Sequence, residues 1–331
     1  MTPQEQMRPR AAVVYQPFKT DLASLRAAVQ KYESANGWAP TRWFETEEAD
    51  AGTGAAHRAL TAGAKVVLAS GGDGTVRAVA EALRGTGTPL GVVPQGTGNI
   101  LARNIGMPLN NVDEAVRAAF QGDNRPIDLG VITITREDES ESEHVFLVLA
   151  GMGLDARTIS TTRSELKKHL GWLAYVDAGV RTMMKDSPLH IQYSFDGSPA
   201  KSLTVYTVMI GNCGLMPGGV LLIPDAKFDD GYLDVVALRP LGRLAWLRIW
   251  RKLGWENGVL RKTKTGRQLI DLVNDTREVT YLRSRRFALS VHEPEPIQLD
   301  GDDFGIARGA SGRVDPGALV LRVLPKWKSV G

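Results

Sequence analysis

Apolar and polar positions alternate with two different rhythms along the chain. In roughly the first 130 residues, short apolar runs typical of strands are separated by amphipathic helical segments. Strands are expected at Ala11–Pro17, Thr41–Thr46, Gly63–Ser70 and Pro89–Pro94. Helices are expected at Asp21–Ser34, with Asp21 as its cap, at Asp50–Gly63 and at Thr75–Leu83. This order predicts βαβ units and a parallel sheet, with ligand sites at the carboxyl ends of its strands.

From about Ile127 the strand-like runs follow one another across turns. They are Ile127–Arg136, Glu143–Gly151, Leu189–Ser198, Ser202–Asn212, Gly231–Pro240, Arg277–Ser284, Arg286–Pro294 and Ala318–Pro325. Asp196-Gly197 is a hairpin signal, and the acidic Arg136–His144 is expected at a solvated hairpin tip. Helical patterns interrupt the series near Ser164–Lys185 and Leu241–Trp255. The second half is therefore predicted to be an antiparallel β-sandwich or flattened barrel.

The predicted fold is thus a Rossmann-like α/β nucleotide-binding domain followed by an antiparallel β-sandwich domain. We place the first domain at 8–127 and the second at 128–315. Residues 316–331 are interpreted as a C-terminal strand and tail that pack back on the first domain.

Composition narrows the class of protein. Hydrophobic residues make up 43% and charged residues 23% of the 331 positions, as in ordinary soluble enzymes. The longest apolar run, Val145–Leu154, is about half the length that a bilayer-spanning helix needs. The N-terminus has no apolar core of a signal peptide, and the only cysteine, Cys213, excludes an internal disulfide. The expected location is the cytoplasm.

A glycine-rich turn, Gly71–Thr75, joins an apolar strand to a helix. It lacks the Gly-Lys-Ser/Thr ending of a P-loop and the glycine spacing of dinucleotide folds. Its glycines allow backbone N–H groups to approach a phosphate, toward which the following helix would point its positive end. Because the carboxylate of Asp73 repels phosphate, Mg²⁺ held by ATP is the natural bridge. The alternative is a tight turn in which Asp73 only caps the helix.

A second turn of the same type, Pro94–Gly106, follows the next strand. It offers backbone N–H groups and the Thr97 hydroxyl just before a helix that is expected to begin near Ile100. Two such turns after neighbouring strands favour a site for nucleotide phosphates over either turn being merely structural.

The two turns, read as "GGDGTVRAVAEAL" and "PQGTGNILARNIG", resemble the catalytic domain of the diacylglycerol kinase family, in its soluble bacterial lipid-kinase branch. The resemblance continues through "AGMGLDARTI" at Ala150–Ile159, the glycine, proline and acidic segment Gly211–Leu238, and "IQLDGDD" at Ile297–Asp303. NAD kinases and phosphofructokinases are similar to the first turn only.

This resemblance implies ATP bound in a cleft between the α/β domain and the sandwich. Carried over residue by residue, it implies phosphate contacts from Gly71, Gly72, Asp73, Gly74, Thr75, Val76 and Arg77, with Thr97 from the second turn and Thr46 near the nucleotide. It also implies that Asp300 is the general base that accepts the proton of a lipid hydroxyl. The alternative for Asp300 is a hairpin Asp-Gly without a catalytic role.

The segment Asp225–Asp234 is dense in carboxylates, which favours a hard cation. It does not have the ligand spacing of an EF-hand. The resemblance implies a structural Mg²⁺ held by Asp230 and by the backbone carbonyls of Lys227 and Tyr232. A solvated acidic hairpin is the alternative.

Three positions depart from the family pattern. Ile100 stands where many members have Asp, so Asp73 and Asp128 are expected to take a larger part in holding the water shell of Mg²⁺–ATP. The late motif reads Asp-Gly-Asp with Asp302 in place of Glu, and the first strand ends in Gln16-Pro17 where Asn-Pro is usual.

The stretch from Arg239 to Arg267 holds nine basic residues and one acid, Glu256. Within it, Leu241–Trp255 has the pattern of a basic amphipathic helix rich in Trp, which suits a helix that lies on a membrane surface. A helix packed on the sandwich, with solvated arginines, is the alternative.

Together these features predict an ATP- and Mg²⁺-dependent lipid kinase, peripheral to the inner face of the membrane. Diacylglycerol is the leading acceptor, with sphingoid bases and phosphatidylglycerol-type lipids as competitors. A soluble-substrate kinase of the NAD kinase type and a catalytically silent nucleotide or lipid sensor stay as alternatives. Neither turn resembles a base-reading module, so no nucleic-acid partner is expected. The sequence does not decide whether the protein forms a homodimer.

Overall fold

The chain forms two compact units. The computed structural model describes residues 8–48, 50–153, 188–215, 222–223, 225–239 and 279–327. The first unit comprises the residues up to Leu129 together with the C-terminal residues from Asp315, and the second comprises Gly130–Val314. Strands β5 (Asp123–Thr135) and β14 (Asp302–Val323) each contribute residues to both units.

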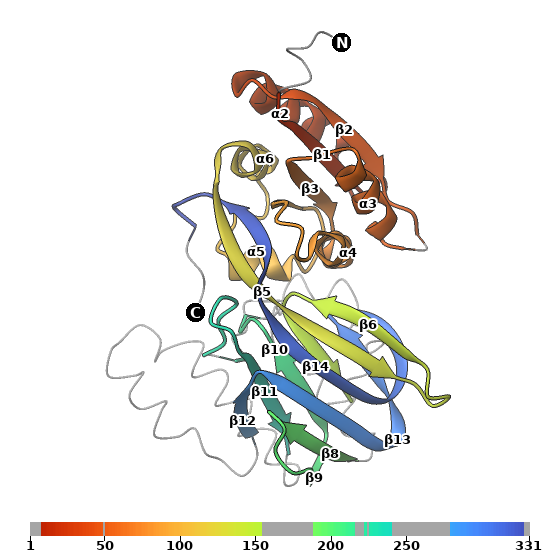
Figure 1. The fold of residues 1–331 in the computed structure, drawn as a ribbon. Coiled ribbons are helices and arrows are strands. Elements are labelled where there is room, and N and C mark those ends of the chain that lie inside the picture. The colour runs from red at the N-terminus through yellow and green to blue at the C-terminus, as the bar shows by residue number, and fades with distance from the viewer. Residues whose placement is uncertain are drawn as a thin grey trace, which may run out of the picture. The chain divides into compact units, whose positions relative to one another are not determined.

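The first unit is built on a parallel sheet in the order β4-β3-β1-β2 (Figure 1). Its strands are β1 (Arg10–Tyr15), β2 (Ala39–Glu45), β3 (Val66–Gly71) and β4 (Leu90–Pro94). The end of β14 extends the sheet, with Leu321 beside Leu90 in parallel. Strands β3 and β4 are buried along their whole length, which explains why they read as continuous apolar runs.

Helices cover this sheet. The helices are α2 (Leu22–Ala35), α3 (Thr53–Thr61), α4 (Asp73–Leu83), α5 (Ile100–Asn104) and α6 (Val112–Gln121). Helix α2 packs against α6, and α3 packs against α4 (Figure 1). Asp21 caps α2 as expected, because its carboxylate accepts the N–H of Ser24 at 3.1 Å. The expected α/β fold of the first half is confirmed.

The second unit is antiparallel and β-rich, as expected. Besides parts of β5 and β14 it contains β6 (Glu141–Phe146), β7 (Leu149–Met152), β8 (Leu189–Phe195), β9 (Lys201–Val205), β10 (Thr207–Gly211), β11 (Leu233–Leu238), β12 (Val279–Ser284) and β13 (Arg286–Leu299). The strand order is β12-β11-β10-β7-β13-β14; β8 pairs with β13 and β9 with β8, while β5 pairs with β14 and β6 with β5. The predicted hairpin at Asp196-Gly197 links β8 to β9, and the acidic tip links β5 to β6.

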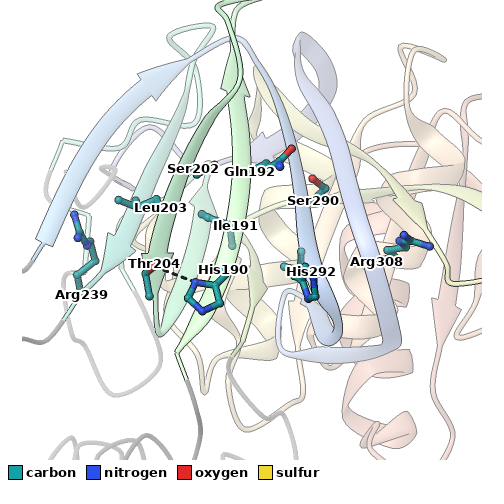
Figure 2. Close-up of a pocket in the computed structure, with 11 residues that line it drawn as sticks. His190, Ile191, Gln192, Ser202, Leu203, Thr204, Arg239, Ser290, His292 and Arg308 are labelled. Atoms are coloured by element: carbon teal, nitrogen blue, oxygen red, sulfur yellow. Dashed lines mark hydrogen bonds between the residues drawn. The ribbon is translucent and has the colours of Figure 1, made fainter.

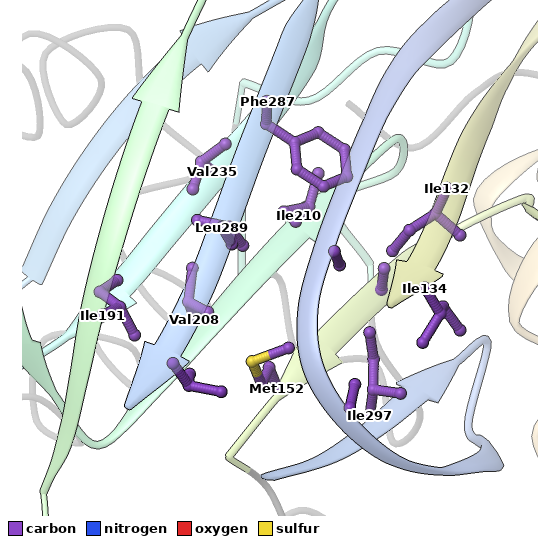
Figure 3. Close-up of a cluster of buried hydrophobic side chains, with 14 of the residues drawn as sticks. Ile132, Ile134, Met152, Ile191, Val208, Ile210, Val235, Phe287, Leu289 and Ile297 are labelled. Atoms are coloured by element: carbon purple, nitrogen blue, oxygen red, sulfur yellow. The ribbon is translucent and has the colours of Figure 1, made fainter. Parts of the chain in front are cut away.

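The core of this unit lies between its strands (Figure 3). Apolar side chains of β5, β8, β10 and β13 meet there, including Ile132, Ile191, Ile210, Phe287 and Leu289. Along β8 they alternate with polar ones, so the pattern identifies its inward face, whereas β10 is buried along its whole length.

Two expected strands are each divided in the structure. Glu143–Gly151 is split between β6 and β7, because the N–H groups of Leu147 and Val148 between them donate to the Asp300 side chain instead of a neighbouring strand. Ser202–Asn212 is split between β9 and β10 at Tyr206.

Two expected helices cannot be compared with the structure. Those near Ser164–Lys185 and Leu241–Trp255 lie outside the described residues. Among the helices that the structure describes, none is both long and apolar enough to cross a membrane.

Candidate nucleotide-binding and metal-binding sites

The sheet of the first unit reverses its strand order between β1 and β3. In open α/β sheets, ligands bind where the loops at the carboxyl ends diverge at such a point. The loop after β1, residues 16–20, is fixed there: the N–H of Gln16 donates to the carbonyl of Ser70 at 3.0 Å, and the Thr20 hydroxyl donates to the same carbonyl at 3.2 Å. The turn after β3 follows Ser70 directly, so the two loops share one edge of the sheet.

The first glycine turn is shorter than expected. Helix α4 begins at Asp73, two residues before the predicted Thr75, with Gly72 as its N-cap in an extended conformation. Helix α4 has eleven residues, and the unpaired N–H groups of its first turn therefore lie directly at the switch point. A Cβ at Gly71 would lie 2.6 Å from the Thr75 hydroxyl oxygen, so this turn needs glycine to close.

The second glycine turn packs directly on the first. A Cβ at Gly96 would lie 2.7 Å from the Cα of Gly72, and the N–H of Gln95 donates to the carbonyl of Gly71 at 2.9 Å. Within the second turn, Asn99 adopts a left-handed conformation with φ 47°, and its side chain exchanges two hydrogen bonds with the backbone of Gly96. Two backbone segments that lie 24 residues apart in sequence, Gly72 and Gly96, thus form one surface.

Asp73 ties the two turns together. Its Oδ1 atom accepts the N–H of Ile100, the first residue of α5, at 2.6 Å. A Cβ at Gly98 would lie 2.5 Å from Oδ2, so glycine is required for this approach. The capping role considered for Asp73 is therefore present, but on α5 and not on its own helix. Ile100 is buried and serves this contact through its N–H.

The other residues expected at the nucleotide lie at the same edge of the sheet, in α4 or, in the case of Asp128, in β5. Thr97 is exposed in the second turn, and Thr46 follows β2, with its N–H donating to the carbonyl of Tyr15 at 3.0 Å. Val76 and Arg77 are buried in α4, where the Arg77 guanidinium lies 3.5 Å from Glu81. Asp128 is also buried, and it accepts the N–H of Gly317 at 2.8 Å.

Lys19 is a candidate that the sequence reasoning missed. Its Nζ atom lies 3.5 Å from where a Cβ at Gly72 would be, which places a cation beside the first glycine turn. Lys19 follows Phe18, which is 96% exposed, in the loop after β1. The predicted βαβ order was the signal that could have identified it. In such a sheet, the loop that follows a strand at the switch point is a candidate ligand loop.

Asp300 belongs to the second unit and forms the β13–β14 hairpin with Gly301. Both residues have positive φ, 52° and 89°, as a two-residue Asp-Gly hairpin requires. The Asp300 carboxylate is buried and accepts three backbone N–H groups, from Leu147 at 2.8 Å, Val148 at 2.8 Å and Leu149 at 3.0 Å. These bonds hold the carboxylate in a single orientation.

The acidic segment Asp225–Asp234 of the second unit ends in a buried carboxylate, that of Asp234. Asp234 is 7% exposed, and its Oδ2 atom has no hydrogen-bond partner among the residues that the structure describes. Burial raises the pKa of Asp234 to about 6; Arg283 opposes this shift, and Asp230 and Asp225 add to it. Asp230 accepts the N–H of Tyr232 at 3.1 Å and pairs with Arg283. Arg283 also lies 3.9 Å from Asp234, and Arg285 donates to the Tyr232 hydroxyl at 3.2 Å, so three carboxylates lie near two arginines.

This charge distribution fits a bound cation. Within the described residues no cluster of three or more His, Cys, Asp or Glu side chains is arranged for a metal. The expected donor set has one carboxylate, that of Asp230, with the carbonyls of Lys227 and Tyr232. Such a set suits Mg²⁺, which keeps several of its waters. The unpartnered oxygen of Asp234 supplies further negative charge beside it.

Comparisons with known proteins match the α/β half and the β-rich half of the chain to two domain families. Residues 10–132 match the diacylglycerol kinase catalytic domain, and residues 148–323 match the YegS C-terminal NAD kinase beta sandwich-like domain. A diacylglycerol kinase of Bacillus subtilis (strain 168) is 28% identical over 309 residues, which is 91% of this chain and 92% of that protein. A probable lipid kinase YegS-like of Pseudomonas aeruginosa (strain UCBPP-PA14) is 34% identical, covering 79% of this chain and 77% of its own length.

A solved structure has the same fold. The crystal structure of a diacylglycerol kinase from Bacillus anthracis str. Sterne superposes with a TM-score of 0.64 at 16% identity, over 96% of this chain and 98% of that one.

Proposed function

The chain belongs to the diacylglycerol kinase family of lipid kinases and is a phosphotransferase, and on that premise we propose that it transfers the γ-phosphoryl group of ATP to the hydroxyl of diacylglycerol. The observation that carries this proposal is the pair of glycine turns at the switch point, which Asp73 ties together and beside which Lys19 lies. Backbone N–H groups at the start of α4 and a nearby ammonium suit a polyphosphate.

In this proposal, each part of the chain has one chemical task. The first turn of α4 and Lys19 bind phosphate oxygens, while Thr97 and Thr46 contribute from the same edge of the sheet. Asp300, oriented by its three backbone donors, accepts the proton of the lipid hydroxyl as it attacks phosphorus. Mg²⁺, when bound to the nucleotide, neutralises the charge on the phosphates.

The acceptor is tested with one assay run on separate substrates. Wild-type protein and ATP would be incubated with diacylglycerol, sphingosine or phosphatidylglycerol in mixed micelles, or with NAD in solution. A phosphorylated diacylglycerol as the main product supports the proposal. Phosphorylated NAD alone would move the protein to the soluble-substrate class, and nucleotide binding without any product would favour a silent sensor.

Substitutions of Asp73 separate its two roles. Asparagine keeps an oxygen that accepts the N–H of Ile100, whereas alanine removes the contact between the turns. We expect kcat/KM for ATP to fall about 100-fold in Asp73→Ala and about tenfold in Asp73→Asn, because a misplaced turn costs more than a missing charge. Steady-state kinetics would measure both variants. Equal losses would mean that the carboxylate charge, and not the contact, matters.

Lys19→Met removes the cation beside Gly72 and leaves the backbone in place. We expect the KM for ATP to rise about tenfold with little change in stability, because an exposed lysine contributes charge-assisted hydrogen bonds to phosphate only when the ligand is bound. Lys65→Met is the matched control, since the exposed Lys65 precedes β3 at the opposite edge of the sheet. A similar rise in the control would exclude a specific role for Lys19.

Magnesium is expected to stabilise the protein through Asp230. At neutral pH and without nucleotide, millimolar Mg²⁺ should raise the Tm by about 2–6 °C, because a cation offsets the repulsion among Asp225, Asp230 and Asp234. Thermal melts of the wild type and Asp230→Asn would test this. The same rise in Asp230→Asn would place the magnesium site elsewhere.

A further inference from the structure

The second unit has a cavity of about 660 Å³ on strands β8, β9, β13 and β14 (Figure 2). None of the residues proposed above for phosphoryl transfer or for magnesium lines it. Its lining is mixed: Arg239, Arg308, His190 and His292 contribute along with hydroxyl and amide side chains, and three apolar residues, Ile191, Leu203 and Val291, complete it. Nothing in the reaction proposed above uses this cavity.

Strand register explains why polar groups gather here. Along β8 and β13 the side chains of Ile191 and Val291 enter the apolar core, so those of their neighbours in sequence face outward. Gln192 stands opposite Ser202 on one side and Ser290 on the other. His190 stands opposite Thr204, and its Nδ1 atom lies 3.1 Å from the Thr204 hydroxyl.

The lining favours an anion. Arg239 and Arg308 lie on opposite sides of the cavity, with His190 and His292 between them (Figure 2). None of the described residues that line it is Asp or Glu. Arginine stays charged at all physiological pH values and presents several N–H donors that match phosphate oxygens. Two such groups at its two ends, with no Asp or Glu among the described lining residues, favour a negatively charged ligand.

The cavity also has the size and hydroxyls for more than a bare phosphate. Its volume falls within the range of small-molecule sites. Ser202, Thr204 and Ser290 can donate to and accept from the hydroxyls of a polyol. Most of the lining side chains are exposed, so a headgroup can enter while its acyl chains stay in a bilayer.

We propose that this cavity binds a glycerol phosphate group, either free or as the headgroup of an anionic phospholipid. The inference goes beyond the kinase activity, since it assigns a second, non-catalytic anion site to the β-rich unit. Such a site would increase the time that the enzyme spends on membranes rich in anionic lipid.

The test compares a double variant with a control of equal charge. Arg239→Gln with Arg308→Gln removes both cavity arginines. Arg286→Gln with Lys201→Gln removes two exposed charges from β13 and β9 that do not line the cavity. Binding would be measured by calorimetry with sn-glycerol 3-phosphate and by sedimentation with vesicles of phosphatidylcholine containing about 30% phosphatidylglycerol. Thermal melts would verify that each variant is folded.

We expect the cavity variant to lose about fivefold in affinity for each arginine, and the control to stay within about twofold of the wild type. Loss of vesicle binding assigns the phospholipid headgroup as the ligand, and loss of glycerol phosphate binding alone assigns the free ester. Equal affinities for wild type and cavity variant with both ligands would overturn the proposal. Equal losses in the cavity variant and the control would overturn it as well.

Discussion

Replacing Asp300 with asparagine is expected to lower the kcat for lipid phosphorylation by about 10²–10⁴-fold, because the amide cannot accept the proton of the attacking hydroxyl. The KM for ATP should change little. Asparagine retains one oxygen for the N–H groups of Val148 and Leu149, but it turns an NH₂ group toward the N–H of Leu147. A loss of stability of about 1–3 kcal/mol should accompany the loss of turnover.

The chain offers a matched control for this experiment. Asp196 also opens an Asp-Gly turn with positive φ, 49° followed by 76°, and its Oδ1 atom accepts the N–H groups of Arg285 and Arg286 at 2.9 Å each. Asp196→Asn should therefore also replace the carboxylate of an Asp-Gly turn with an amide, but without a loss of kcat. If Asp300→Asn keeps kcat within about fivefold of the wild type at a temperature where it is folded, Asp300 is a hairpin residue and not the base.

Gly96→Ala should reduce kcat/KM for ATP by at least about 100-fold. The new Cβ would lie 2.7 Å from the Cα of Gly72 and 3.1 Å from the Asn99 side-chain oxygen, and the first of these neighbours is backbone that cannot swing aside. The two turns must then separate, and a displacement of about 1 Å in a phosphate site costs about two orders of magnitude in rate. The variant should still fold, because the change lies in the loop between β4 and α5 and not within a helix or strand.

Gly87→Ala separates this effect from general destabilisation. Gly87 has φ 72° in an exposed loop, and a Cβ added there would meet no atom within 4 Å, so alanine adds backbone strain away from both turns. It should lower the Tm and leave turnover unchanged. Comparable losses of turnover in the two variants would show that Gly96 acts through stability and not through the spacing of the turns.

Much of the fold follows from local sequence. The apolar runs identify β1, β3 and β4, and Asp21 and Asp196-Gly197 mark a helix start and a hairpin from residues that are neighbours in sequence. Both helix capping and turn formation depend on backbone conformations within a few residues, which is why these predictions succeeded.

The long-range contacts within each unit could not be predicted from local sequence in the same way. Asp73 meets Ile100, Lys19 meets Gly72, and Asp300 meets Leu147, in each case across many intervening residues. Such pairings are set by the order of strands in a sheet, which periodicity does not encode. The break between β6 and β7 has the same origin, because the apolar pattern continues through residues whose N–H groups serve Asp300.

Transfer of a phosphoryl group to lipid is tested most directly by comparing ATP labelled at the γ-phosphate with ATP labelled at the α-phosphate. Each would be incubated with diacylglycerol in mixed micelles and with wild-type protein or Gly96→Ala. We expect label to enter the lipid fraction only from the γ-position and only with the wild type. Label that stays in the aqueous phase in every sample, or enters lipid equally with Gly96→Ala, would contradict it.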